Sequence, residues 1–422
     1  MCRIASVFCI LLPFLQIDAS MPATIATLDI DGISVINCKQ MAFPVGHVLP
    51  MGQPGDIANY TPSEAIGYAM RNAVAAKDQA FFQQLLNGYL YLINQTTLYR
   101  QGQQHLPENM LAIGLIGWSP NIVNIGSGLS AYQANLPNSF VSSASDADID
   151  IITAMIDAIS QWGDMTAADP LSSGSNVISS TGMQALCSTA IESFVKNELG
   201  TFNWNGMSYY ALTLDNWGHD TPNPDYFDPT AFAKMIQFVG ADSTLGKSLD
   251  QAALGTIQFI KDVATQGQGW IPDTPWTPGM PSTFGYDAVR ILMRFGEYVA
   301  LDKDPLNMMD SVKGVLKGLA QNLFSNGYLV WQNGTLTFTP SGLTLGQFTG
   351  PLLVALKALQ NCNSLPSDVT AEDVSNLQNC LNHDLAQYQV DSMQDWQKCY
   401  FAIELALLSQ AIIQEFPPSS TR

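Results

Sequence analysis

Apolar residues recur every three or four positions along most of this chain, the spacing expected for one face of an α-helix. The clearest example runs from Ser145 to Trp162, with Ser145 as the expected N-cap and Asp148 three residues later. Another helix opens at Pro62 and Ser63. The same spacing predicts further helices at residues 81–93, 181–198, 229–239, 249–265, 285–300, 308–323, 347–360, 371–388 and 394–415.

Strand-like alternation is rare. One segment with a strong strand signal, Tyr328 to Phe338, has Asn333–Gly334 as its turn and predicts a β-hairpin. Residues 24–60 are rich in Pro and Gly, so we expect them to be irregular. About a dozen helices, without a βαβ rhythm or an obvious linker, predict one all-α domain over residues 24–422. No repeat of fixed period is found, which favours a closed ring of helical hairpins over an open solenoid.

The first residues are typical of an export signal. Arg3 precedes an apolar run that is too short for a membrane span, and small residues follow it up to Ala23. We therefore predict a signal peptide over residues 1–23 and a secreted or periplasmic protein; the alternative is a buried first helix. No later segment is long and apolar enough for stable membrane insertion.

Composition narrows the class of protein. Hydrophobic residues make up 47% of the chain and charged residues 13%, so a disordered chain is excluded. The net charge of −19 repels phosphate backbones, which argues against nucleic acid as a partner. There is no CxxC pair, and the four histidines are scattered, so we expect neither a metal site nor a cofactor. Cys362, Cys380 and Cys399 could provide one disulfide in an oxidising compartment.

Three acidic segments could carry chemistry, and each also has a plain structural interpretation. Glu64 lies in the first turn of a predicted helix, where an acid also complements the helix dipole. Asp146, Asp148 and Asp150 alternate at another helix start and could bind sugar hydroxyls or simply belong to a capped helix. Asp287 precedes Arg290 by three residues, so the guanidinium can orient the carboxylate or form an ordinary ion pair.

Together these segments resemble glycoside hydrolase family 8. The family pattern SEGQGYGM is similar to SEAIGYAM at 63–70, A[ST]D[AG]D to ASDAD at 144–148, and YDAxR to YDAVR at 286–290. NPSYFAP is similar to NPDYFDP at 223–229, and Pro272–Asp273 is a further short match. The order and spacing of these motifs agree over residues 63–300.

The resemblance implies an (α/α)6 barrel that cleaves β-1,4-glycosidic bonds with inversion. Glu64 matches the general acid, Asp287 the general base, and Asp146 the aspartate that holds the sugar at the cleavage point. The substrate-binding residues by position are Tyr68, Trp118, Asp148, Tyr226, Phe227, Tyr286 and Arg290. We expect a monomer that acts on a cellulose-like glucan; xylan and chitosan are the alternatives within the family.

The chain departs from the family pattern beside the acid. Ala65 and Ile66 replace Gly-Gln, which motivates a second hypothesis, a glycan-binding toroid that has lost catalysis. For catalysis, Glu64 has to be protonated, and we expect apolar neighbours such as Ile66 to favour that form. Asp287 has to be ionised, and we expect Arg290 to favour that form.

Overall fold

The fold of the 422-residue chain is taken from a computed structural model. The predicted signal peptide, residues 1–23, lies outside the described residues. Among the helices that are described, none is long and apolar enough to cross a membrane. The structure describes residues 26–30, 33–38, 40–43, 47–50, 63–101, 114–117, 143–169, 177–215, 222–273, 284, 287–301, 303–325, 329–332, 335–338, 345–390 and 396–416.

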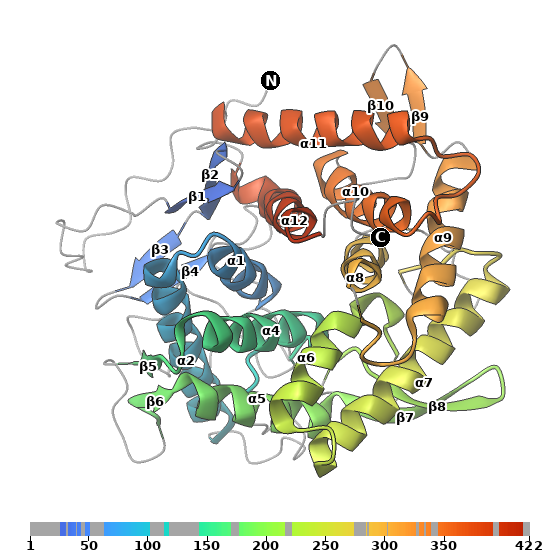
Figure 1. The fold of residues 1–422 in the computed structure, drawn as a ribbon. Helices are drawn as coiled ribbons and strands as arrows, with labels where there is room; N and C mark the ends of the chain where they lie inside the picture. The colour runs from blue at the N-terminus through green and yellow to red at the C-terminus, as the bar shows by residue number, and fades with distance from the viewer. Residues whose placement is uncertain are drawn as a thin grey trace.

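Six helices form a closed inner ring (Figure 1). Each contacts the next along the chain, and the last contacts the first. In the helix that begins at Val289, every residue except Glu297 is buried. The ring consists of α1 (Ser63–Ala75), α4 (Ser145–Trp162), α6 (Pro229–Val239), α8 (Val289–Ala300), α10 (Leu345–Asn361) and α12 (Trp396–Gln414).

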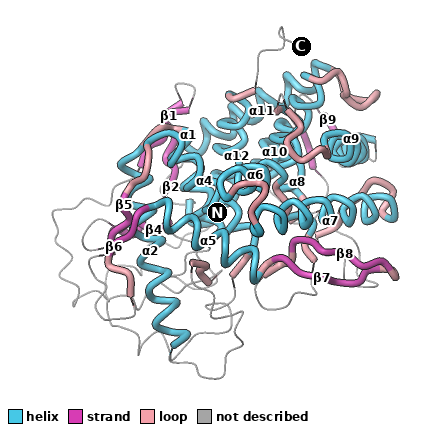
Figure 2. Tube along the Cα trace, turned by 60° about the horizontal axis from the view of Figure 1, so that its bottom comes forward, coloured by secondary structure: helices cyan, strands magenta, loops and turns pink. Residues whose placement is uncertain are grey.

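Five outer helices each follow an inner helix and pack against it. The described chain is therefore a toroid of helical hairpins, and the predicted all-α (α/α)6 barrel is confirmed. Figure 2 shows the helices as the body of the molecule, with short strands at its edges. The outer helices are α2 (Gln79–Gln101), α5 (Met183–Asn197), α7 (Thr244–Gln266), α9 (Met309–Ser325) and α11 (Ala371–Val390).

Strands are more numerous than the sequence pattern predicts. The expected hairpin near 328–338 is confirmed: β9 (Leu329–Gln332) pairs antiparallel with β10 (Thr335–Phe338). Among the described residues there are four further antiparallel pairs that were not predicted. They are β1 (Ala26–Ile30) with β2 (Ile33–Cys38), β3 (Gln40–Phe43) with β4 (His47–Pro50), β5 (Thr166–Ala168) with β6 (Ser180–Gly182), and β7 (Leu199–Trp204) with β8 (Met207–Leu212).

The expectation of an irregular segment at 24–60 was wrong where β1 to β4 form two hairpins. Strand β2 contacts α11 and α12, and β4 contacts α1 and α2. These hairpins therefore lie on the outside of the ring between α11 and α2, at the position that the five outer helices leave for a sixth (Figure 1).

Glycine allows two pairs of inner helices to approach closely. A Cβ at Gly67 of α1 would lie 2.8 Å from the Cβ of Asp150 on α4. A Cβ at Gly296 of α8 would lie 2.8 Å from a methyl carbon of Val354 on α10. Contacts this short are not tolerated in a packed interior, so side chains at these positions would push the helices apart.

The inner helices all run in the same direction, because each outer helix returns the chain before the next inner helix begins. Their N-terminal ends therefore gather at one end of the ring. At the start of α4 the predicted cap was wrong: the N-cap residue is Ala144, and no side chain caps the helix. The hydroxyl of Ser145 donates instead to the carbonyl oxygen of Thr213 at 2.6 Å, which ties the helix start to the end of the β7–β8 hairpin.

Candidate active site

The starts of three inner helices bring the predicted catalytic residues together. Glu64 lies in the first turn of α1, and Asp146 in the first turn of α4. Asp287 comes two residues before α8 begins, and Arg290 lies in the first turn of that helix. Helix N-termini carry partial positive charge, so carboxylates are stabilised at this end of the ring.

Arg290 is the centre of the cluster. Its Nη1 donates to Oδ1 of Asp287 at 2.7 Å, and its Nη2 donates to Oε2 of Glu64. The same Nη2 lies 3.3 Å from Oδ2 of Asp146, while Nε donates to the hydroxyl of Tyr68 at 3.0 Å. One guanidinium thus joins groups from α1, α4 and the start of α8, and we call these residues the Arg290 cluster: Arg290, Glu64, Asp146, Asp287 and Tyr68.

Exposure divides the cluster into two kinds of side chain. Glu64 is 20% exposed and Asp287 is 28% exposed. Arg290 and Asp146 are only 4% and 3% exposed. A substrate that arrives from solvent can therefore reach Glu64 and Asp287, while the buried Arg290 holds both of them and is itself paired with the buried Asp146.

Burial governs the protonation of Asp287. Burial raises the pKa of its carboxyl, Arg290 lowers it, and the negative charges of Asp273 and Glu64 raise it, so the pKa lies above its ordinary value. We expected Arg290 to favour the ionised form, and its contribution has that direction, but burial outweighs it. A carboxylate with a raised pKa is a stronger base near neutral pH.

Asp146 has the same tendency. Burial raises its pKa, with the positive charges of Arg290 and Arg294 acting against the rise. One of its carboxyl oxygens, Oδ1, has no hydrogen-bond partner among the described residues. A buried polar atom without a partner is unfavourable, so this oxygen needs a partner that the described residues do not supply.

Two predicted binding residues surround Arg290. Tyr68 is fully buried, and burial raises the pKa of its hydroxyl, so the group stays neutral and hydrogen-bonded to Arg290. The guanidinium carbon of Arg290 lies 5.2 Å from the ring centroid of Tyr226, a cation–π distance. Both aromatic residues therefore fix the orientation of the arginine.

Other predicted binding residues lie elsewhere. Phe227 is fully buried, with edge contacts to Phe232 and Phe295, so it belongs to the core. Asp148 is also buried, and its negative charge helps burial to raise the pKa of Glu198. Trp118 and Tyr286 lie outside the described residues.

A second set of charges lies one turn deeper, and of its members only Asp150 stands out in the sequence. Arg294 Nη2 donates to Asp150 at 2.8 Å, and Arg71 Nη1 donates to the other oxygen of Asp150 at 2.8 Å. Arg71 also pairs with Glu297 at 2.8 Å and Asp228 at 3.5 Å. We call these residues the Arg294 cluster: Arg294, Arg71, Asp150, Asp228 and Glu297. Periodicity places each on an inner helix face or cap but does not indicate which residues meet.

Asp273 supports the base from the loop after α7. Its Oδ1 accepts a hydrogen bond from the backbone N–H of Ala288 at 2.9 Å, so it anchors the residue that follows Asp287. In the sequence only the short Pro272–Asp273 match pointed to this position.

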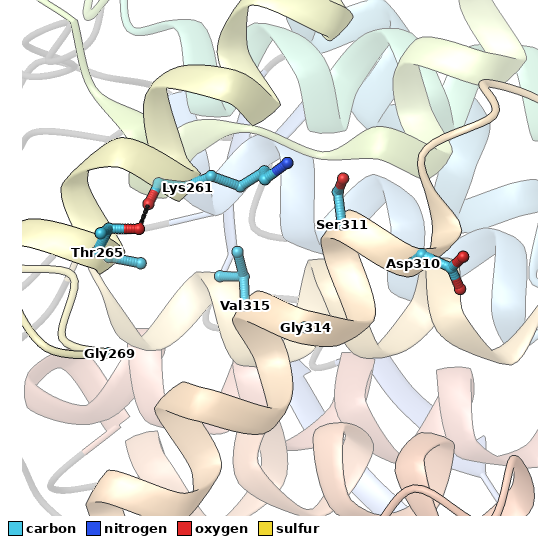
Figure 3. Close-up of a pocket in the computed structure, with 8 residues that line it drawn as sticks. Lys261, Thr265, Gly269, Asp310, Ser311, Gly314 and Val315 are labelled. Atoms are coloured by element: carbon cyan, nitrogen blue, oxygen red, sulfur yellow. Dashed lines mark hydrogen bonds between the residues drawn. The ribbon is translucent and has the colours of Figure 1, made fainter.

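A separate cavity of about 530 Å³ opens between the outer helices α7 and α9 (Figure 3). Lys261 and Thr265 line it from α7, and Asp310, Ser311 and Val315 from α9. None of the predicted site residues lines it. In the part of the chain that the structure describes, no group of three or more His, Cys, Asp or Glu side chains is arranged to hold a metal ion.

Comparison of the sequence with models of protein families and with curated proteins finds no match. Comparison of the structure does find similar folds. One is a β-1,3-1,4-glucanase from Paenibacillus sp. X4, 18% identical, with a TM-score of 0.56 over 90% of this chain and 88% of the other. Another is a GH8 protein in complex with xylobiose from Teredinibacter turnerae, 16% identical, with a TM-score of 0.55 over 88% of this chain and 86% of the other.

A cold-adapted family 8 xylanase is also similar, at 14% identity, with a TM-score of 0.56 over 89% of this chain and 85% of the other. At such identities the likeness establishes the fold alone. The chain has the fold of glycoside hydrolase family 8, and the resemblance seen in its motifs is confirmed at that level.

Proposed function

We propose that the protein is an inverting glycoside hydrolase that cleaves β-1,4 linkages in a cellulose-like glucan, with Glu64 as general acid and Asp287 as general base. The observation that carries the proposal is the meeting of these two partly exposed carboxylates, from opposite parts of the chain, at the two terminal nitrogens of Arg290. The names of the structural neighbours, which include glucanases and xylanases, support the same class of reaction.

The chemistry assigns one task to each carboxyl group. Glu64 donates a proton to the leaving glycosidic oxygen as the bond to the anomeric carbon breaks. A water molecule attacks that carbon from the opposite face, and Asp287 takes its proton. This mechanism needs about 6.5–9.5 Å between the carboxyl groups. The guanidinium of Arg290 lies between Glu64 and Asp287 and keeps the two carboxyl groups out of direct contact.

Arg290 and Asp146 prepare the site. Asp146 offers its unpartnered oxygen to a hydroxyl of the sugar at the cleavage point, and the site has to open around this buried oxygen for the hydroxyl to reach it. Arg290 holds Asp287 while the stacked ring of Tyr226 fixes its plane. The contact between Arg290 and Glu64 favours an ionised Glu64, so sugar binding has to replace this contact before Glu64 can donate a proton.

The binding-only hypothesis has less support from the structure. Its motivation was the replacement of Gly-Gln by Ala65 and Ile66 beside the acid. Both side chains are buried in the core at the start of α1, with exposures of 1% and 0%. Neither therefore occupies the solvent-facing side on which Glu64 is exposed.

Release of reducing sugars tests these alternatives. We expect release from carboxymethylcellulose, and the same assay on xylan and chitosan decides the polymer. Proton NMR during the first minutes should show the α-anomer as the first product, because inversion of a β-linkage gives α. A first product in the β-form would overturn inversion, and binding of all three polymers without release would favour the glycan-binding toroid.

We also infer export, with cleavage near residue 23, since a polymeric substrate lies outside the cell. N-terminal sequencing of the protein recovered from the medium or periplasm checks this. An intact N-terminus that begins at Met1 would contradict it. Size-exclusion chromatography with light scattering checks the expected monomer.

A further inference from the structure

Asp225 is a buried acid for which the catalytic scheme has no use so far. It lies in the 3-10 turn Pro224–Tyr226, before α6, and is fully buried. Its backbone N–H donates to the side chain of Asn223 at 3.0 Å. Neither of its carboxyl oxygens has a hydrogen-bond partner among the described residues. Such a group is unfavourable unless it meets a partner during function.

The position is also a departure of this chain. The family pattern that the segment resembles, NPSYFAP, has a serine where this sequence has Asp225. A small hydroxyl is thereby replaced by a titratable group next to the proposed base. The substitution changes the number of ionisable groups at the site.

The charged groups around Asp225 bear on whether its carboxyl is protonated. From α8 and the turn before it, Asp287, Arg290 and Arg294 face it, and from the loop after α7 Asp273 does. Burial raises the pKa of Asp225 well above its usual range, and the charges of Asp287 and Asp273 add to this rise. Arg290 and Arg294 act in the other direction but are already paired with Asp287 and Asp150. A carboxyl group this buried, without a hydrogen bond on either oxygen and with both neighbouring arginines already paired, is favoured as the neutral acid.

We propose that Asp225 is a positioning residue for the base: a neutral carboxylic acid that donates a hydrogen bond, through one water, to the carboxylate of Asp287. This inference rests on the proposed function. A protonated carboxyl has one O–H donor, and the turn Pro224–Tyr226 that holds Asp225 contacts α8, which begins two residues after Asp287. The hydrogen bond stabilises the ionised base, against burial and against the charges of Asp273 and Glu64.

Asp225 keeps its own proton throughout the reaction. The attacking water transfers a proton to Asp287, whose negative charge is lost, and Asp225 then faces a neutral carboxyl. When Asp287 returns its proton to solvent, the original hydrogen bond forms again. Asp225 therefore affects the pKa of the base and not the number of protons exchanged.

The experiment compares the pH profiles of kcat/KM on the best soluble substrate for Asp225→Ala and Asp225→Asn. Asp225→Ala removes the donor, so the acidic limb should move up by about one pH unit, the size of a hydrogen bond to a charged group. Asp225→Asn retains an N–H donor and should hold the limb within about a third of that shift. Glu404→Gln, a buried carboxyl bound to Asn72 on other helices, is the matched control and should leave the limb in place.

Two results would overturn the proposal. If both Asp225 variants lower the limb, Asp225 is ionised in the native protein. If neither variant moves it, Asp225 has only a packing role. NMR titration of the side-chain carboxyl carbons in aspartate-labelled protein gives the pKa values of Asp225 and Asp287 without any assay of activity. The variants Asp225→Asn and Asp287→Asn assign the two signals. If Asp225→Ala does not fold, or if the wild type is inactive, the NMR titration therefore still tests the proposal. Inactivity on every polymer would count against the proposed function and not against the role of Asp225.

Discussion

Arg290 and Arg294 lie one turn apart on α8, yet they meet different kinds of carboxylate. Arg290 holds Glu64 and Asp287, which are 20% and 28% exposed. Arg294 holds Asp150, which is 1% exposed and is also bound by Arg71. Both clusters use the same chemistry, but the Arg294 cluster has its main carboxylate satisfied on both oxygens while the Arg290 cluster leaves an oxygen of Asp146 unpartnered.

The difference teaches that exposure of the carboxylates, more than charge, separates a structural cluster from a candidate catalytic one. A carboxylate that is buried and paired on both oxygens, such as Asp150, contributes little to chemistry, because no substrate can reach it. The partly exposed carboxylates Glu64 and Asp287 at the end of the ring can be reached by a ligand. Mutations in the two clusters should therefore have different effects on activity.

The largest expected effect is on turnover. Glu64→Gln and Asp287→Asn should each lower kcat by about 10³-fold, since general acid and base catalysis is worth about 10²–10⁴-fold. The melting temperature should fall little, because both side chains are partly exposed. Reducing-sugar release and circular dichroism measure the two effects. Asp157→Asn, which removes a half-exposed pair with Lys234, is the control with retained turnover. Near wild-type kcat in either site variant would refute its role.

The next effect is on stability. Arg294→Met leaves Asp150 with a buried and half-satisfied carboxylate, and loss of one partner of a buried pair costs about 3–5 kcal/mol. Arg290→Met also leaves the buried Asp146 without its ion pair, so its loss of stability should be of similar size, but this variant should in addition lose most of the activity. Urea unfolding and reducing-sugar release from the two variants give the comparison. Equal losses of activity would mean that the two clusters are not different in kind.

A smaller effect is expected at Gly67, where α1 packs closely against Asp150 of α4. Gly67→Ala places a Cβ 2.8 Å from that of Asp150 and 3.2 Å from the carbonyl oxygen of Ala147, so α1 has to move away from α4. We expect a loss of about 1–3 kcal/mol, typical of overpacking, and a fall in kcat, because Glu64 moves with α1. Gly314→Ala on α9 meets no atom within 4 Å and should gain up to about 1 kcal/mol from helix propensity. Stabilisation by both substitutions would contradict this account of the interface.

Much of the ring could be predicted from the sequence, because each helix leaves a local pattern of apolar residues along the chain. Helical periodicity marks α4 and α6 at the bounds that the structure has, Ser145–Trp162 and Pro229–Val239. The β7–β8 hairpin was missed although Asn205 and Gly206 give the same turn signal as the predicted hairpin. Their φ angles of 48° and 79° fit the turn that an Asn-Gly pair favours.

The site could be predicted less completely. The Asp287–Arg290 pair follows from a spacing of three within one segment. Contacts between segments do not follow from spacing: Arg290 with Glu64 and Arg294 with Asp150 join residues 226 and 144 positions apart. Local context singled out Glu64, but only the resemblance of the motifs paired it with Asp287, and nothing in the sequence pointed to Arg71. Periodicity indicates which face is buried, whereas the partner on the next helix depends on how the ring closes.

The smallest expected effect is a shift in the pH dependence of activity, and it tests the Arg290 cluster alone. Burial and the negative charges of Asp273 and Glu64 raise the pKa of Asp287, so the acidic limb of kcat/KM should lie above about pH 3.9, the ordinary value for aspartate. Asp273→Asn removes one of these charges, while its side-chain oxygen can still accept from Ala288. The ionised base is then easier to form, so activity should persist to a pH lower by up to about one unit. Asp262→Asn, on the outer helix α7, should leave the limb unchanged, and an upward shift in Asp273→Asn would show that Asp273 acts by fixing the backbone at Asp287 and not by its charge.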